Sequence, residues 1–312
     1  MKAALAPAPA PSSRDAVLYL GMALLGTLWG LGFSMMKLAA VHGIPAMAFA
    51  FWQTLLAGLL VLGLAAWRGR MPSLRPDYLR YALMAGGIGI ALPSVVAQTA
   101  LGALPAGVFA VMIQTVPMMT YGMSLAVGLE HFVAIRFAGI ALGFVGALAL
   151  VVPEGALPAA GLAGWVLFGF ITPTCYAFNN VALSRLRPSG ADSIALAAAK
   201  MLAAAAILGP LMLVFDQLYL PLPVRHAGDV ALMAQVGIST IAFALFFELQ
   251  RQRGPVFTSQ VGYVVTATGL FWGWLLFNER HSVWIWLAVA SIVAGMVLVS
   301  RRPDAARRRA NV

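Results

Sequence analysis

The sequence predicts an all-α integral membrane protein with ten transmembrane helices arranged as two inverted five-helix repeats. The first observation behind this prediction is composition. Of the 312 residues, 62% are hydrophobic and only 10% are charged, and the mean hydropathy is +0.90. A soluble domain carries about 25% charged residues, so this chain has too little polar surface to face water. The other two observations are an internal repeat and the placement of basic residues between apolar stretches.

The two halves of the chain resemble each other at a single offset. The matching pairs are Tyr81–Ala85 with Val230–Ala234, Glu130 with Glu279, Gly146 with Gly295, and Ala147–Ala149 with Met296–Leu298. An offset that aligns a rare acid and a glycine as well as apolar runs indicates two homologous halves of similar length. In membrane proteins, halves of this kind are typical of transporters, which are built around the interface between them.

Each half contains five apolar stretches of the length needed to cross a bilayer, about 20 residues. The predicted spans are 16–41, 45–67, 78–102, 105–129, 132–152, 161–183, 193–215, 230–249, 255–277 and 282–299. The first repeat therefore covers 16–152 and the second 161–299, between a disordered N-terminal tail (1–15) and a basic tail (300–312). Prolines interrupt any signal-peptide core in the first tail, so we expect the first helix to remain as an uncleaved anchor.

The basic residues predict the orientation. With the N-terminus in the cytoplasm, most of the 20 lysines and arginines fall in cytoplasmic segments, whereas Lys37, Arg225 and Arg280 fall at or near the outer face. This bias follows the positive-inside rule, and ten spans return the basic C-terminal tail to the cytoplasm. Five spans per half make the second repeat enter from the opposite side, so the repeats are predicted to be inverted. We expect a multi-pass protein of the bacterial inner membrane.

Several other function classes are disfavoured. The net charge of +10 could suggest nucleic acid as a partner, but the basic residues are spread between apolar stretches. The single cysteine, Cys175, allows no disulfide or thiolate cluster within the chain, and the four histidines form no spaced metal motif. A Walker-type loop is missing from the sequence. We therefore expect no cofactor, no metal, no nucleic-acid partner and no enzymatic activity.

Short motifs at repeated positions carry a resemblance to a known family. They are Trp29-Gly30 with Phe33, Pro105-Ala106-Gly107 and Pro117, Leu129-Glu130 followed by Gly139 and Gly146, Gly254-Pro255-Val256, Phe277-Asn278-Glu279, and Gly295. In this order the chain resembles the drug/metabolite transporter superfamily, in particular carriers with two EamA domains, and most of all YddG-type exporters of aromatic and other neutral amino acids. It departs from many relatives by carrying Trp52-Gln53 where they have an arginine, and Lys200 stands in the pseudo-equivalent stretch.

The sixth span carries the clearest stripe of candidate substrate contacts. Trp165, Thr172, Tyr176 and Asn179 recur at helical spacing, and Pro173 leaves a backbone carbonyl of the preceding turn without its partner. Aromatic, amide, hydroxyl and carbonyl groups suit a zwitterion with an apolar side chain. The alternative is that these groups join neighbouring helices by hydrogen bonds.

Further candidates lie in other spans. Gln114 and Tyr263 are repeat equivalents, and Gln260 shares a helix face with Tyr263. Gln98 is a candidate for either substrate contact or interhelical hydrogen bonding, and Trp29 for either aromatic stacking or core packing. Because polar groups in lipid are costly, we expect these residues to face the protein interior.

Three charged residues also need an interpretation. Lys200 lies within the seventh span, where it either binds a substrate carboxylate or extends its ammonium to the cytoplasmic face. Glu130 and Glu279 precede the fifth and tenth spans, and each is predicted to cap the helix that follows it.

The favoured function is a secondary transporter that exports small metabolites, foremost neutral or aromatic amino acids, by alternating access. The alternative is an efflux carrier for lipophilic drugs or other metabolites, and a channel or a membrane enzyme fits less well. The expected partners are a small-molecule substrate and membrane lipid, and a homodimer is an arrangement that the sequence leaves open.

Overall fold

The computed structural model describes residues 13–150, 157, 161–182 and 186–300, and within these ranges the regular elements are helical. They are, in chain order, α1 (Ser13–Val41), α2 (Ala46–Trp67), α3 (Pro76–Gly86), the π-helical turn η1 (Gly87–Ala91), α4 (Leu92–Leu101), α5 (Ala106–Ile113), α6 (Val116–Ala126), α7 (Ala134–Ala149), α8 (Leu162–Gly169), α9 (Ile171–Ala182), α10 (Ser193–Val214), α11 (Ala227–Ser259), α12 (Val261–Phe277) and α13 (Val283–Ser300). The prediction of an all-helical chain is confirmed for the described residues. The expected tails at 1–15 and 300–312 lie almost wholly outside them.

Prolines explain why three predicted spans consist of more than one helical segment. Pro93 follows η1 in the first turn of α4, Pro117 stands in the first turn of α6, and Pro173 stands in the first turn of α9. A proline has no N–H to donate, and its ring clashes with the carbonyl of the preceding turn. The helix therefore restarts at each of these positions, or widens locally to a π-turn.

The boundary between the predicted eighth and ninth spans is wrong. We expected a connection at 250–254, but α11 runs on to Ser259 and the chain turns at Gln260 instead. Residues 250–253 are glutamine and arginine, which have good helix propensity. Their polarity indicates that the chain leaves the hydrocarbon region of the membrane here, but the helix can continue beyond that boundary.

Seven helical segments of the described chain are long and apolar enough to cross a membrane, and α7 and α12 are shorter apolar helices. The count of ten spans therefore stays a prediction. Large apolar side chains are widely exposed on the outside of the bundle, for example Leu60 on α2 at 53% and Phe144 on α7 at 63%. A surface of this kind suits contact with lipid rather than water.

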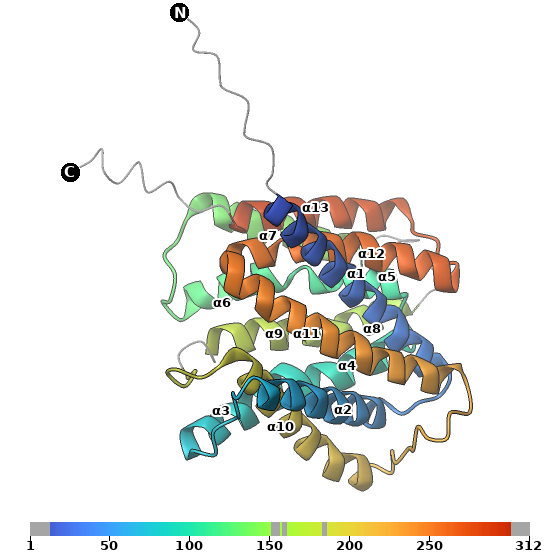
Figure 1. The fold of residues 1–312 in the computed structure, drawn as a ribbon. Helices are drawn as coiled ribbons and strands as arrows, with labels where there is room; N and C mark the ends of the chain where they lie inside the picture. The colour runs from blue at the N-terminus through green and yellow to red at the C-terminus, as the bar shows by residue number, and fades with distance from the viewer. Residues whose placement is uncertain (1–12, 151–156, 158–160, 183–185, 301–312) are drawn as a thin grey trace, which may run out of the picture.

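Helices of one half pack against helices of the other, and two of these pairs, α7–α13 and α2–α10, are repeat equivalents. In Figure 1, α7, α12 and α13 lie along one side of the bundle and α2, α3 and α10 along the other, with α1 and α11 between them. α7 packs on α13, α2 packs on α10, and α1 packs on both α11 and α12. At the α2–α10 contact, a Cβ on Gly58 would lie 3.1 Å from Met201 Cβ, and a Cβ on Gly209 would lie 3.2 Å from Phe51. These two helices therefore run antiparallel.

The α7–α13 crossing is built on small residues. A Cβ placed on Gly139 would lie 2.6 Å from the Gly295 carbonyl oxygen, and one on Gly146 would lie 3.0 Å from the Ala288 carbonyl oxygen. By the offset that relates the halves, Ala288 is the counterpart of Gly139, and Gly295 is the counterpart of Gly146. Each glycine thus meets the counterpart of the other. The two helices cross antiparallel with their backbones in contact.

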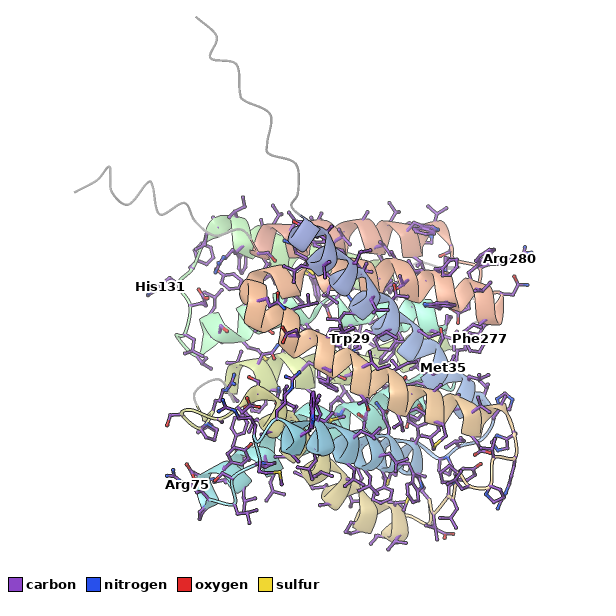
Figure 2. The ribbon with its side chains drawn as sticks, in the orientation of Figure 1. Trp29, Met35, Arg75, His131, Phe277 and Arg280 are labelled. Atoms are coloured by element: carbon purple, nitrogen blue, oxygen red, sulfur yellow. The ribbon has the colours of Figure 1, made fainter. Side chains whose placement is uncertain are left out.

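The two ends of the bundle carry different groups. Arg75 and His131 lie at one end, and Phe277 and Arg280 lie at the opposite end (Figure 2). His131 follows Glu130 in sequence and Arg280 follows Glu279. The segments that contain the two repeat-related glutamates are therefore at opposite ends of the molecule.

Candidate functional site

Buried polar atoms without a hydrogen-bond partner mark the interior of the bundle. Within the described chain they include Ser34 Oγ, Gln53 Oε1, both polar atoms of the Gln98 amide, Asn179 Oδ1 and Gln235 Oε1. Burial of an unpaired amide or hydroxyl costs about 1–3 kcal/mol, and most such groups in folded proteins have a partner. Several orphaned neutral groups on helices of both halves therefore indicate a place where a ligand or water binds.

The best defined part of this set lies where α1, α2 and α11 meet. Gln53 Nε2 donates to Ser239 Oγ at 3.0 Å, which leaves the Oε1 atom of Gln53 unpaired. Gln235 precedes Ser239 by one helical turn, and its Oε1 atom lies 3.1 Å from where a Cβ on Gly32 would stand. The missing side chain at Gly32 lets the Gln235 amide approach the α1 backbone. Neutral amides and a hydroxyl are thus gathered from both halves.

A second part involves α4, α9 and η1. Gln98 on α4 is only 1% exposed. Asn179 on α9 lies against Gly89 in η1, and its Oδ1 atom occupies the space that a side chain at this glycine would need. Thr172, from the same predicted stripe, donates to the Pro93 carbonyl at 3.3 Å. For Thr172 the structure favours interhelical hydrogen bonding, whereas Asn179 and Gln98 keep unused polar atoms.

The repeat-related residues Gln114 and Tyr263 lie in neighbouring segments, α5 and α12. Gln114 ends α5 and is 5% exposed, and its side-chain oxygen lies against Gly262 at the start of α12. Tyr263 is the next residue and packs on the largest apolar cluster. The Trp29 ring contacts Phe246 in a tilted arrangement, with 5.5 Å between ring centroids, so aromatic side chains of α1 and α11 are adjacent.

The other predicted residues differ in how deeply they are buried, and Tyr176 lies one helical turn before Asn179. Tyr176 and Lys200 are half-buried on α9 and α10, whereas the Gln260 side chain is exposed. Trp165 is 39% exposed and lines a shallow surface cavity with Phe168 and Thr99. The structure does not bring Trp165 or Gln260 to the buried amides.

The predicted caps at Glu130 and Glu279 are wrong. Glu279 accepts hydrogen bonds from the backbone N–H groups of Ala106 (2.7 Å) and Gly107 (3.0 Å), and it therefore caps α5 of the other half instead of the helix that follows it. Glu130 pairs with Arg136 at 3.2 Å, while α7 begins without a side-chain cap. The sequence could not show this, because a free helix N-terminus accepts an acid from any neighbouring segment.

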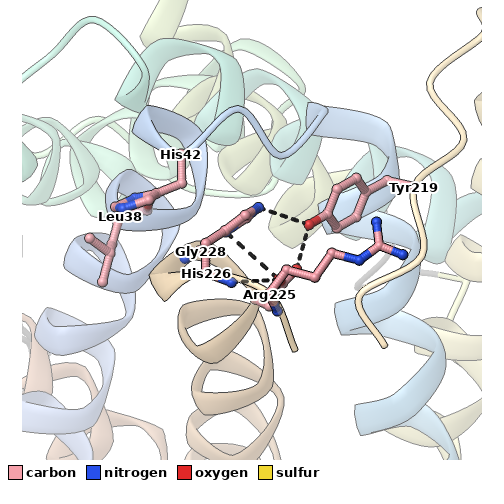
Figure 3. Close-up of polar contacts among 7 residues, drawn as sticks. Leu38, His42, Tyr219, Arg225, His226 and Gly228 are labelled. Atoms are coloured by element: carbon pink, nitrogen blue, oxygen red, sulfur yellow. Dashed lines mark hydrogen bonds and ion pairs between the residues drawn. The ribbon is translucent and has the colours of Figure 1, made fainter. Parts of the chain in front are cut away.

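A second polar cluster joins α1, the α10–α11 loop and the start of α11 (Figure 3). Tyr219 donates to Asp229 Oδ1 at 2.5 Å, and its oxygen lies 3.0 Å from His226 Nε2. The Gly228 N–H lies in hydrogen-bonding position to His226 Nδ1 at 3.2 Å. The His42 ring stacks on His226 at 5.8 Å.

Asp229 organises this cluster. It is fully buried and also accepts from the backbone N–H groups of Arg225 (2.9 Å) and His226 (3.2 Å). Burial and the hydrogen bond to Asp229 raise the pKa of Tyr219 above its ordinary value of 10.0. Trp52 Nε1 donates to the Tyr219 carbonyl at 2.7 Å. The cluster thus fastens the loop of the second half to α2 of the first.

Sequence reasoning missed Gln53, Gln235 and Ser239 as site candidates. A signal was present, because Gln235 and Ser239 are four residues apart and share one face of a mainly apolar stretch of helix. Gln53 was identified only as a position where many relatives have an arginine. A single sequence does not show which helix packs against it.

Comparison with known proteins identifies relatives along the whole chain. The model of the EamA-like transporter family matches residues 17–152 and again 163–301. The "Uncharacterized inner membrane transporter YedA" of Escherichia coli strain K12 is 29% identical over 281 residues, covering 88% of this chain and 87% of the relative. The same protein of strain O157:H7 gives the same values. A solved crystal structure matches with a TM-score of 0.62 at 18% identity, covering 93% of this chain and 99% of that one, and shows a shared fold.

Proposed function

Because this chain belongs to the EamA-like transporter family, we propose that it exports a small neutral metabolite by alternating access of its two EamA domains. The substrate class we propose is amino acids with apolar or aromatic side chains. The membrane is the bacterial inner membrane, as for the relative named an inner membrane transporter.

Two halves of opposite orientation give alternating access a structural basis, and two observations support this arrangement. The equivalent helices α7 and α13 cross antiparallel through Gly139–Gly295 and Gly146–Ala288, the pattern that a pseudo-twofold axis in the membrane plane generates. The segments after Glu130 and Glu279 lie at opposite ends of the bundle (Figure 2). With this symmetry, one rearrangement of the halves exposes a central site first to one side and then to the other.

The buried neutral amides carry the proposal on substrate class. The orphaned polar atoms of Gln53, Gln98, Asn179 and Gln235 offer both hydrogen-bond donors and acceptors without net charge. Among the described residues, the carboxylates with buried side chains, Asp229 and Glu279, are both already paired near the ends of the bundle. A neutral or zwitterionic ligand suits this interior better than a lipophilic cation, which would require a free carboxylate.

Counterflow into proteoliposomes tests the proposal directly. The purified protein should exchange labelled neutral or aromatic amino acids against an internal pool of the same compound, and it should leave nucleosides and lipophilic cations untransported. Exchange of a lipophilic cation, with no exchange across the amino-acid panel, would refute the substrate class.

Asn179 and its neighbour Asn180 supply a test variant and its matched control. Asn179→Ala and Tyr176→Ala should weaken apparent affinity about 5- to 150-fold, because a lost hydrogen bond or stacking contact with substrate is worth about 1–3 kcal/mol. Asn180→Ala is the control, since Asn180 is exposed and makes only a 3.4 Å bond to Thr120. Equal transport by all three variants at equal folded yield would mean that the α9 stripe serves helix packing alone.

A further inference from the structure

Glu279 connects the two EamA domains at the end of the bundle that holds Arg280. Its Oε1 atom lies 2.6 Å from Lys37 Nζ on α1 and accepts from the Ala106 N–H, while Oε2 accepts from the Gly107 N–H. Lys37 and α5 belong to the first domain, whereas Glu279 belongs to the second. One carboxylate of the second domain is thus held by three donors of the first.

The surroundings make this contact tight. The Glu279 and Lys37 side chains are only 6% and 15% exposed, and Lys37 Nζ lies 4.8 Å above the centre of the Phe277 ring. The His281 ring covers the start of α5, because a Cβ on Gly107 would lie 2.8 Å from its Cε1 atom. Charge-assisted hydrogen bonds in a shielded place are among the stronger polar contacts of a protein.

The repeat-related acid at the other end of the bundle has different exposure and different partners. Glu130 is the counterpart of Glu279, but its side chain is 49% exposed and pairs with Arg136 of its own domain. The counterparts of Ala106 and Gly107 are Pro255 and Val256, which lie inside the continuous helix α11. A helix interior has no free N–H groups for an acid to cap, whereas the first turn of α5 has them.

We propose that Lys37, Glu279 and the first turn of α5 form a latch that closes the transport path at the outer face, and that opening to this face breaks it. The proposal rests on the transport function inferred above and assigns Glu279 as the residue that holds the outward-closed state. The asymmetry between Glu279 and Glu130 is what a molecule closed at one end is expected to have, because two inverted domains alternate between states in which only one end is latched.

The test measures access from the outer face and needs no knowledge of the substrate, so it can fail independently of the transport assay. Ser34 provides the probe, because it is fully buried, lies one turn inside Lys37 and changes little on replacement by cysteine. In protein whose single native cysteine, Cys175, is replaced by alanine, Ser34→Cys is labelled with a membrane-impermeant maleimide added outside. Glu279→Gln should speed this labelling about ten- to hundredfold, since it removes charge-assisted hydrogen bonds.

Glu130→Gln is the matched control, because it removes the repeat-related acid at the opposite face and should leave the rate unchanged. Thr54→Cys, at a buried position in α2 with 1% exposure, should stay slow in every variant and reports general loosening. Lys37→Gln repeats the test if Glu279→Gln yields no folded protein. The latch is refuted if folded Glu279→Gln and Lys37→Gln label at the parent rate, or if Glu130→Gln accelerates labelling as much as they do.

Discussion

Substitution of Gly139 by alanine tests how closely α7 and α13 approach. The added methyl would stand 2.6 Å from the Gly295 carbonyl oxygen, 2.9 Å from Val299 and 3.0 Å from Leu298. Ordinary van der Waals contact begins at 3.4 Å, so backbone must move by most of an ångström to admit it. Overpacking of this kind costs about 1–3 kcal/mol, which exceeds the gain of up to about 1 kcal/mol from replacing a helical glycine by alanine.

The assay is unfolding of the purified protein in detergent micelles. The circular dichroism of its helices is measured as a denaturing detergent is added. Gly63→Ala is the control, because Gly63 lies in α2 with nothing within 4 Å of its added Cβ. Gly63→Ala should be neutral or slightly stabilising, whereas Gly139→Ala should lower the free energy of unfolding by about 1–3 kcal/mol. Equal stability of the two variants would show that α7 and α13 do not cross at backbone contact.

Two further predictions concern the ends of the bundle. Single cysteines at Arg75 and Pro188, in protein without its native cysteine, should be shielded from an impermeant thiol reagent added outside. One at Val224, which is 52% exposed in the α10–α11 loop, should react; the reverse pattern would overturn the predicted orientation. Tyr219→Phe should remove an alkaline loss of stability. Because the folded-state pKa of Tyr219 lies above 10.0, its protonated form stabilises the fold below that pH, and this stabilisation is lost as pH rises through the raised pKa. Thermal unfolding between pH 8 and pH 11 measures it, and parallel curves for parent and variant would contradict the role assigned to the bond with Asp229.

Much of the architecture follows from patterns that one sequence contains. The apolar stretches predict the helices, and the single offset predicts two homologous halves, which the two EamA matches confirm. Prolines at 93, 117 and 173 stand where helices are interrupted, whereas Pro210 and Pro255 lie inside continuous helices, so a proline alone does not predict a break. These features are local, so the residues concerned carry the signal themselves.

The site was harder to predict because it depends on which residues meet. Gln114 and Tyr263 were identified from the repeat, whereas Gln235 became a candidate only once Gly32 was seen opposite it. The prediction that Glu279 caps the helix after it was wrong, because its actual position at α5 depends on a contact between domains. Trp165 has the spacing of the Tyr176 stripe, but α8 and α9 are separate segments, and a break in the helix rotates one part of a stripe relative to the other.

The small-residue crossing of α7 and α13 has a consequence for how the two halves diverge. Each of its contacts takes one residue from each half, Gly139 with Gly295 and Gly146 with Ala288. A larger side chain in either half therefore meets the backbone of the other, and no change within its own half makes room for it. At this crossing, the size allowed at one position is set by a helix encoded in the other half of the gene.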